Sequence, residues 1–319
     1  ACYGKGGNDP TVTDANLFLG RLGSNSKLGG WMNLNINASD KVIKNLSDKL
    51  KISKTELAEG ILSIINAKMA DAIRTITVKE GIDPREFSLV AFGGAGSMHA
   101  VWLAEELEIK EVIVPNDPGT FSAWGMLQTD IRRDLTVNFF QPFQGLSKEK
   151  IIETYNKLEA EAADLLVKEN VKNSDMSFML TADMRYIGQE YYVNVPIKLP
   201  INLEEINKNF HFTYEQQYGH STPEGPCEFI NLRLIAVGKI SKSESMKSID
   251  KKNIKEKSSR KIIFNKKNYE TDILDRQIIE TNEKFIGPIV IEEETATTVI
   301  PPNYSLIKDD YGNLIINKN

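Results

Sequence analysis

The chain has 319 residues and a formal net charge of −5 at pH 7, and 41% of its residues are hydrophobic. This length and composition are typical of about two globular domains with a buried core. The acidic balance argues against a general nucleic-acid or anionic-membrane surface. No apolar run approaches the roughly 18 residues that would span a bilayer, and no signal peptide is visible.

The cysteines and the one basic stretch bear on the redox compartment and on nucleic-acid binding. Cys2 and Cys227 show neither a disulfide framework nor the spacing of a metal site, so a reducing, cytoplasmic setting is expected. The basic stretch 239–267 has no aromatic residue before Phe264. We therefore interpret it as a solvated linker rather than a nucleic-acid patch.

The first 80 residues are expected to contain three helices separated by turns. A short helix over 13–19 would have Thr13 or Asp14 as its N-cap. Apolar residues at three- and four-residue spacing predict a second helix over 40–51. A capping-box pattern opens a long amphipathic helix over 53–79, which a glycine then ends.

A glycine turn lies at the centre of the next predicted unit. The apolar run 87–92 predicts a strand, the sequence FGGAGSMH at 92–99 forms the glycine turn, and a helix over 98–108 and a strand over 111–115 follow. Such a βαβ unit predicts two parallel strands. We therefore expect an α/β domain that extends to about residue 135.

The second half of the chain is predicted to contain two helices and many short strands. A charged helix is expected over 148–170 and another helix over 203–219, with strands between and after them. Short strands are expected over 176–186, 190–196, 228–238, 261–264, 271–275, 287–292, 297–300, 305–309 and 313–316. The predicted organisation is an α/β lobe over 1–140 followed by an α+β, β-rich C-terminal region over 141–319.

The glycine turn is the strongest local signal for ligand binding. Glycine permits positive φ and removes the Cβ that would hold a ligand away. The helix that follows directs free N–H groups and partial positive charge at the turn, which suits a phosphate or the sugar side of a nucleotide. A glycine turn between a strand and a helix can also reflect tight packing without any ligand. Two nucleotide interpretations are open on these residues as well: a degenerate dinucleotide fingerprint with Asp117 as its acid, or the strand–glycine–helix element of actin-like ATPases.

Longer motifs favour the second interpretation. GGNDPTVTDANLFLGRLG at 6–23 resembles a signature of the A-type subunits of the hydantoinase/oxoprolinase family. FGGAGSMHAVWLAEELEIKEVIVPNDPGTFSAWGML at 92–127 and RYIGQEYYVNVP at 185–196 are similar to further motifs of that family. So are YGHSTPEGPCEFINLRLIAVG at 218–238 and GPIVIEEETATTVIPPNYSL at 287–306. The resemblance covers nearly the whole chain in order.

The resemblance implies an actin-like ATPase fold and a function. Family members use ATP, with Mg²⁺ to neutralise the transferring phosphoryl group, for chemistry at a carbonyl. The expected reaction is hydrolysis of a cyclic amide of the hydantoin or 5-oxoproline type, with ATP-dependent ketone carboxylation of the acetone type as the alternative. A B-type subunit is the expected partner. The residues expected to line the nucleotide are Gly93, Gly94, Ala95, Gly96 and Ser97.

Asp14 and His99 are the candidate catalytic residues. The family signature supports Asp14, and His99 is a candidate because it lies in the first helical turn beside the glycine turn. Asp14 could also be only a helix cap, and His99 could also be a structural histidine. No residue set identifies a metal site. The family's upstream DxGGT hairpins, which hold phosphates, do not occur in these 319 residues, so we expect weak or no ATPase activity from this chain alone. An inactive scaffold that binds a partner, and a NAD-dependent oxidoreductase that uses Asp117, remain as alternatives.

Overall fold

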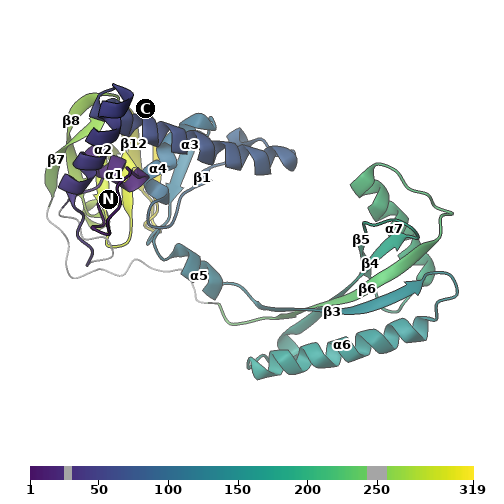
Figure 1. The fold of residues 1–319 in the computed structure, drawn as a ribbon. Helices are drawn as coiled ribbons and strands as arrows, with labels where there is room; N and C mark the ends of the chain where they lie inside the picture. Colours follow the sequence, from purple (N-terminus) through teal and green to yellow (C-terminus); the bar gives the residue numbers. More distant parts are fainter. Residues whose placement is uncertain (25–30, 243–256) are drawn as a thin grey trace. The chain divides into compact units, whose positions relative to one another are not determined.

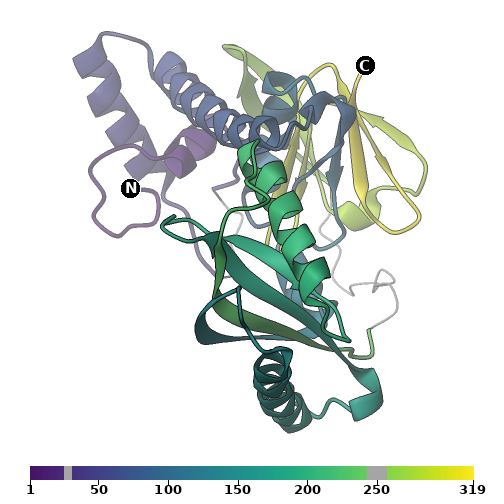
Figure 2. The same cartoon turned by 90° about the vertical axis from the view of Figure 1, so that its right-hand side faces the viewer.

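The computed structural model describes residues 1–24, 31–242 and 257–319. The chain forms two compact units (Figures 1 and 2). Unit 1 comprises Ala1–Met126 and Glu244–Asn319, and unit 2 comprises Leu127–Ser243. No helix in the described ranges is both long enough and apolar enough to cross a membrane.

Unit 1 combines helices from the N-terminal part of the chain with strands from both ends. Its helices are α1 (Val12–Phe18), α2 (Ile36–Leu50), α3 (Lys54–Lys79), α4 (Gly96–Glu106) and α5 (Phe121–Leu127), the last at the boundary between the units. Its strands are β1 (Leu89–Val90), β2 (Glu111–Val114), β7 (Ser258–Phe264), β8 (Lys267–Leu274), β9 (Lys284–Ile286), β10 (Ile289–Glu292), β11 (Thr297–Ile300), β12 (Tyr304–Lys308) and β13 (Leu314–Lys318).

These strands form two sheets. A five-stranded sheet has the order β1-β2-β13-β12-β9, and a four-stranded sheet has the order β11-β10-β8-β7. β1 pairs with β2 in parallel, which confirms the predicted βαβ unit. On its other side β2 pairs with β13 in antiparallel fashion. Val101 of α4 packs with Val112 and Leu314 in one core, so the helix between β1 and β2 covers strands from both ends of the chain.

The expected domain boundary at residue 140 does not coincide with the compact units. The strands after residue 257 belong to unit 1 because β13 completes the sheet of β2, and β7 lies against the turn after α1. Residues 243–256 of the predicted linker 239–267 lie outside the described residues, and residues 258–264 form the strand β7. The mixed α/β fold with a β-rich part is confirmed, and the strands of the β-rich tail pack within unit 1.

Unit 2 is a sheet with two helices. Its elements are β3 (Ile131–Pro142), α6 (Lys148–Lys168), β4 (Met176–Tyr186), β5 (Val193–Ile197), α7 (Leu203–Tyr218) and β6 (Cys227–Gly238). The antiparallel sheet has the order β3-β6-β4-β5. Alternate residues such as Ala182, Val195 and Leu234 share one core with Tyr155 of α6 and Phe210 of α7.

The opposite face of the unit 2 sheet carries a polar network around Asp183. Asp183 is buried there and accepts hydrogen bonds from Asn194 (2.9 Å), Asn231 (2.8 Å) and Arg233 (2.7 Å). Because each oxygen of this carboxylate has a donor, its burial does not leave an unsatisfied charge. The network therefore joins β4, β5 and β6 on the face that the helices leave open.

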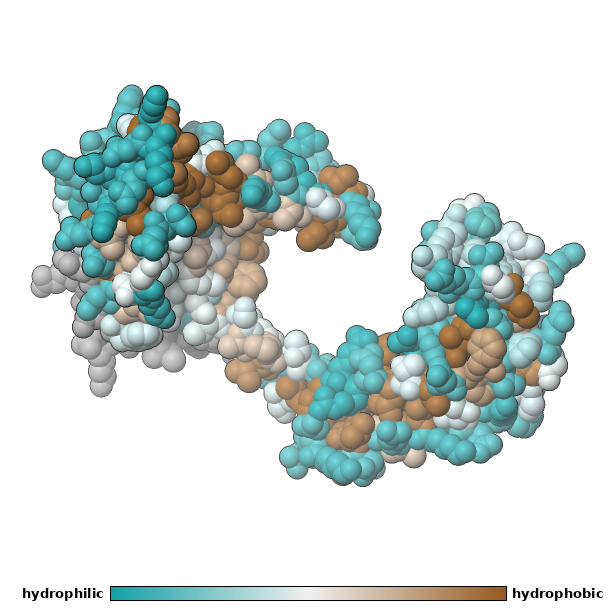
Figure 3. All heavy atoms as spheres, viewed as in Figure 1, coloured by the Kyte–Doolittle hydropathy of each residue, from teal (hydrophilic) through white to brown (hydrophobic). Residues whose placement is uncertain are grey.

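The helix α3 carries an apolar surface that the described chain leaves in contact with solvent. Figure 3 shows hydrophobic side chains gathered over this part of unit 1. The exposed large residues of α3 are Ile64, Ile76 and Val78. These side chains give α3 apolar surface at two places along its length that a partner could contact.

The turn after α1 depends on Gly20, which gives a stability prediction. Gly20 has φ +80°, and an added Cβ would lie 2.6 Å from the carbonyl oxygen of Lys261. Gly20→Ala is expected to lower the free energy of unfolding by about 2–4 kcal/mol, from backbone strain together with overpacking. Denaturant unfolding followed by tryptophan fluorescence measures this change. Trp31, Trp102 and Trp124 all lie in unit 1.

Gly81→Ala is the matched control for that experiment. Gly81 also has positive φ (+70°), but an added Cβ would meet no atom within 4 Å. Gly81→Ala is therefore expected to lower the free energy of unfolding by only about 1–2 kcal/mol, because it introduces backbone strain without overpacking. Equal losses at Gly20 and Gly81 would mean that the close approach of β7 to the turn is wrong.

Candidate functional site

The glycine turn lies at the carboxyl ends of the parallel strands β1 and β2. The turn 91–95 follows β1, and the turn 116–120 follows β2. The amide of Gly93 donates to the carbonyl oxygen of Pro118 at 2.7 Å, which joins the two turns. Ligands of α/β sheets bind outside the carboxyl ends of parallel strands, so this edge is the candidate site.

Part of the glycine content is explained by packing alone. An added Cβ at Gly119 would lie 2.2 Å from Oγ1 of Thr295, and one at Gly94 would lie 3.2 Å from the carbonyl oxygen of Thr295. The connection between β10 and β11 therefore occupies the space beside both glycines. Gly93 has no atom within 4 Å of its would-be Cβ, and its φ of +85° is the reason for glycine there.

The start of α4 nevertheless presents features that suit a nucleotide. Gly94 and Ala95 are exposed, and Ala95 is an N-cap that makes no side-chain hydrogen bond. Within the described ranges, the amides of Gly96 and Ser97 have no hydrogen-bond acceptor. A helix N-terminus with free N–H groups carries partial positive charge and attracts oxygen acceptors of a ligand.

An aromatic cluster lies next to the turn. The ring of Phe92 is 5.3 Å from that of Phe121, and Phe121 is 5.6 Å from Trp124. Phe92 remains 45% exposed. A ring that is held on one side and exposed on the other can stack on a planar base. Periodicity in the sequence did not indicate this cluster, because Phe92 lies in the turn after β1 whereas Phe121 and Trp124 lie in α5.

Ser97 is in the predicted nucleotide set, but its hydroxyl has another partner. The side chain is buried, and Oγ donates to the carbonyl oxygen of Thr297 at 2.9 Å. This bond ties the first turn of α4 to β11. Only the backbone amide of Ser97 remains available to a ligand.

Asp14 is a buried capping residue. It is the third residue of α1, and Thr11 rather than Thr13 or Asp14 is the N-cap. Its carboxylate accepts from the amide of Cys2 (2.8 Å), the amide of Thr11 (2.9 Å) and Oγ of Ser39 (2.6 Å). Burial alone would raise the pKa of Asp14, but the hydrogen bonds from Ser39, Thr11 and Cys2 hold it well below its usual range.

This environment suits a structural role for Asp14. The carboxylate is fully buried. Its donors connect the N-terminal loop, α1 and the start of α2. The local sequence explains the arrangement, because threonine at the N-cap and an acid three residues later form a capping box. The catalytic role predicted for Asp14 stays a prediction.

His99 is buried between α3 and α4. Its Nδ1 lies 2.8 Å from Oδ1 of Asn66, and because that oxygen only accepts, Nδ1 carries the proton. Burial, with the nearby positive charge of Arg21, lowers the pKa of His99. The ring is therefore neutral at pH 7. The structure directs His99 toward Asn66, and its predicted catalytic role is untested.

A metal site does not emerge from the described part of the chain. No group of three or more His, Cys, Asp or Glu side chains that could hold a metal occurs there. Mg²⁺ keeps several waters and binds phosphate oxygens with one or two carboxylates. A magnesium ion carried with ATP would therefore need few ligands from this chain.

Comparisons with known proteins identify the family. The model for hydantoinase/oxoprolinase matches residues 1–135, and that for the hydantoinase/oxoprolinase C-terminal domain matches residues 144–317. The chain therefore belongs to the hydantoinase/oxoprolinase family, as its motifs predicted. These matches divide near residue 140, whereas the compact units follow spatial contacts.

Several relatives are similar over almost the entire chain. An uncharacterised protein of Methanocaldococcus jannaschii is 38% identical over 99% of this chain and 46% of its own length. The alpha subunit of caprolactamase from Pseudomonas jessenii is 29% identical over 97% of this chain and 46% of its own length. This chain thus spans about half the length of these relatives.

Solved structures agree on the fold. The ATP-dependent caprolactamase of Pseudomonas jessenii matches with a TM-score of 0.73 and 28% identity, over 100% of this chain and 48% of that one. A nucleotide-free acetone carboxylase matches with a TM-score of 0.79 and 22% identity, over 100% of this chain and 48% of that one. These neighbours support the actin-like α/β assignment.

The sheet does not favour the dinucleotide alternative. A dinucleotide-binding fold places its glycine turn in a mostly parallel sheet. Here β1 and β2 are the parallel pair of the five-stranded sheet, and its other described pairs are antiparallel. Asp117 lies in the turn after β2 with φ +50°.

Proposed function

We propose that this chain contributes the nucleotide-contacting glycine turn of an ATP-dependent enzyme that opens a cyclic amide. The observation that carries the proposal is the exposed, uncapped start of α4 beside the ring of Phe92. When bound, ATP supplies the phosphoryl group that activates the carbonyl oxygen of the ring. Family membership and the relatives named as ATP-dependent support the same assignment.

The protein would hold the nucleotide mainly through backbone groups of the glycine turn. Amides of Gly96 and Ser97 would meet oxygen acceptors, next to the exposed backbone of Gly94 and Ala95. The exposed ring of Phe92 would stack on the base and exclude water from one of its faces. None of these contacts needs a charged side chain, which agrees with the absence of Lys and Arg from 92–99.

Hydrolysis of a lactam, hydantoin or 5-oxoproline ring is the primary substrate proposal. One subunit of caprolactamase and one 5-oxoprolinase are both similar over nearly all of this chain. Ketone carboxylation is the second candidate, because subunits of acetone and acetophenone carboxylases also match. The two reactions differ in whether bicarbonate is required.

A second polypeptide is part of the proposal. Several relatives are named as subunits of larger enzymes. We propose that the partner is a hydantoinase B-type subunit, in a cytoplasmic hetero-oligomer. The exposed apolar residues of α3 provide surface for such contacts.

Phosphate release from ATP tests this function. The full-length polypeptide with its B-type partner would be assayed with Mg²⁺ and, in separate reactions, caprolactam, 5-oxoproline, hydantoin, N-methylhydantoin, or acetone with bicarbonate. Stimulation by a cyclic amide, with matching formation of the opened product, is the expected result. Stimulation only by acetone with bicarbonate would select the carboxylase. Folded complex that releases no phosphate with any of these compounds would contradict the proposal.

A further inference from the structure

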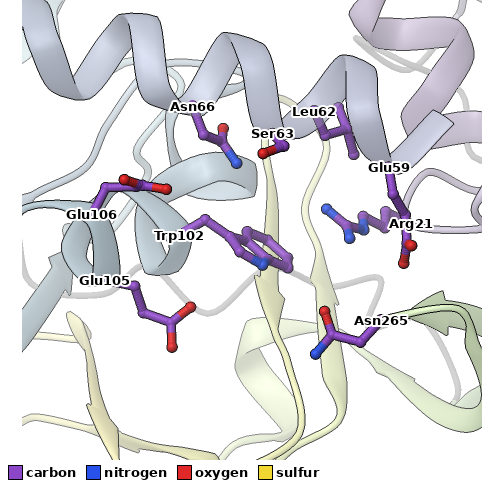
Figure 4. Close-up of a pocket in the computed structure, with 9 residues that line it drawn as sticks. All are labelled: Arg21, Glu59, Leu62, Ser63, Asn66, Trp102, Glu105, Glu106 and Asn265. Carbon is purple, nitrogen blue, oxygen red and sulfur yellow. The ribbon is translucent and has the colours of Figure 1, made fainter. Parts of the chain in front are cut away.

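A pocket in unit 1 lies apart from the glycine turn, along the later turns of α4. It has a volume of about 210 Å³ and is enclosed by α3, α4, the turn after α1 and the turn between β7 and β8. Figure 4 shows its lining, which is mostly polar. The lining residues are Arg21, Glu59, Leu62, Ser63, Asn66, Trp102, Glu105, Glu106 and Asn265.

Arg21 is the unusual member of this lining. It is only 5% exposed, and Figure 4 shows its guanidinium directed toward Trp102. The guanidinium carbon lies 4.2 Å from the centre of the Trp102 ring and 5.5 Å from that of Phe264. Burial lowers the pKa of Arg21 to about 10, against the attraction of Glu59, and the group remains charged at pH 7.

The Arg21 guanidinium lacks the hydrogen bonds that a buried charge requires. Its Nε is buried and has no hydrogen-bond partner among the described residues. A buried unsatisfied donor costs about 1–3 kcal/mol, and more when it is charged. Stacking on Trp102 fixes the plane of the guanidinium but satisfies none of its donors. A ligand with a carboxylate would satisfy them in a bidentate manner.

The lining also carries three carboxylates, which differ in their position and their partners. Glu59 lies beside Arg21, whereas Glu105 and Glu106 lie across the pocket from it (Figure 4). Glu105 pairs with Lys318 at 2.9 Å, and Glu59 accepts from the amide of Lys266 at 2.9 Å. Glu106 is exposed and has no ion-pair partner among residues 1–24, 31–242 and 257–319. The pocket therefore has an unsatisfied cation at Arg21 and an unpaired anion at Glu106.

We propose that this pocket binds a small zwitterion of the amino-acid class, with its carboxylate on Arg21 and its ammonium group on Glu106. The volume of about 210 Å³ corresponds to roughly seven water molecules and is below the roughly 300–1,000 Å³ of pockets for drug-sized ligands. A larger ligand such as a nucleotide does not fit. Asn66 and Asn265 supply neutral donors and acceptors between the two charged ends.

His99 takes the role of a positioning residue in this site. Its Nδ1–H holds Oδ1 of Asn66 at 2.8 Å, which leaves the amide nitrogen of Asn66 to face the pocket. The same helix carries Trp102 and Glu106 to the lining. The proposed zwitterion site does not depend on nucleotide binding at the glycine turn, because none of the residues that line the pocket belongs to that turn.

Direct titration of the full chain without ATP tests the proposal. The probes are glycine, 4-aminobutyrate and 6-aminohexanoate, which increase the separation of the two charges. Hexanoate and hexylamine each carry one charge only. Saturable binding is expected for at least one zwitterion, about tenfold tighter than for either single-charge compound, since each charged hydrogen bond contributes to affinity. Absence of saturable binding by every zwitterion, or equal binding of hexanoate, would overturn the site.

Variants locate the binding. Glu106→Gln is at the surface and is expected to weaken binding of the preferred zwitterion about tenfold while leaving hexanoate unchanged. Glu80→Gln, an equal charge change at the end of α3, is expected to change neither affinity. Arg21→Lys, with its fold checked by circular dichroism, is expected to weaken both compounds because the bidentate geometry is lost. Unchanged zwitterion affinity in Glu106→Gln would refute the proposed orientation.

Discussion

Ala95→Glu is expected to weaken ATP binding by about tenfold or more while leaving the stability of unit 1 unchanged. Ala95 is exposed at the N-cap of α4, so a longer side chain meets solvent rather than the core. A carboxylate there competes for the free amides of the first helical turn and repels the phosphates. The measurement is ATP titration of the full-length enzyme, together with denaturant unfolding.

Two control variants separate the causes. Ala95→Gln has the same size without the charge, and is expected to weaken ATP binding less than Ala95→Glu does. Ala160→Glu introduces the same charge on the exposed face of α6 in unit 2, and is expected to leave ATP affinity unchanged. If Ala95→Glu binds ATP as the unmodified enzyme does, the nucleotide does not contact the start of α4.

Asp14→Ala is expected to lower the free energy of unfolding of unit 1 by about 3–5 kcal/mol. The substitution removes a buried carboxylate that joins the N-terminal loop, α1 and α2, and leaves the amides of Cys2 and Thr11 without their acceptor. Asp9→Ala is the control, because Asp9 is exposed and its loss is expected to stay within about 0.5 kcal/mol. Denaturant unfolding at pH 7 measures both.

The contribution of Asp14 should also depend on pH in a defined direction. Its folded-state pKa is held below the value of about 3.9 for an unfolded chain. The stabilisation is therefore fully present above about pH 5 and decreases as the pH falls through about pH 4 toward the lower folded-state pKa. The difference between the wild type and Asp14→Ala should shrink over that interval. A difference that is small at pH 7 would contradict the structural role.

Local patterns predicted the elements that depend on neighbouring residues. The helix expected over 53–79 is α3 (Lys54–Lys79), because Ser53 caps it and its apolar residues repeat at helical spacing. The charged helix and the βαβ unit are also confirmed, because their patterns of apolar residues are likewise local in the sequence. The strand β3 was missed, although Leu135, Val137 and Phe139 alternate with polar residues as in a half-buried strand.

Long-range pairing could not be predicted in this way. β13, at the C-terminal end of the chain, pairs with β2, and no local pattern in either strand indicates which strand it pairs with. Ser97 and Thr297 are separated by 200 residues, so the sequence could not predict the buried hydrogen bond from the Ser97 hydroxyl to the carbonyl oxygen of Thr297. Thr295 likewise explains Gly94 and Gly119 only once the fold is known. The composition of the glycine turn indicated the site, whereas the roles of its residues came from tertiary contacts.

Photolabelling with 8-azido-ATP tests most directly whether the glycine turn contacts the nucleotide. Trypsin cleaves after Arg85, Lys110 and Arg132, so the turns after β1 and β2 fall in the separate peptides 86–110 and 111–132. We predict that, in the full-length enzyme with Mg²⁺, excess ATP prevents labelling of one or both of these peptides. Labelling that ATP suppresses only in other peptides would contradict it.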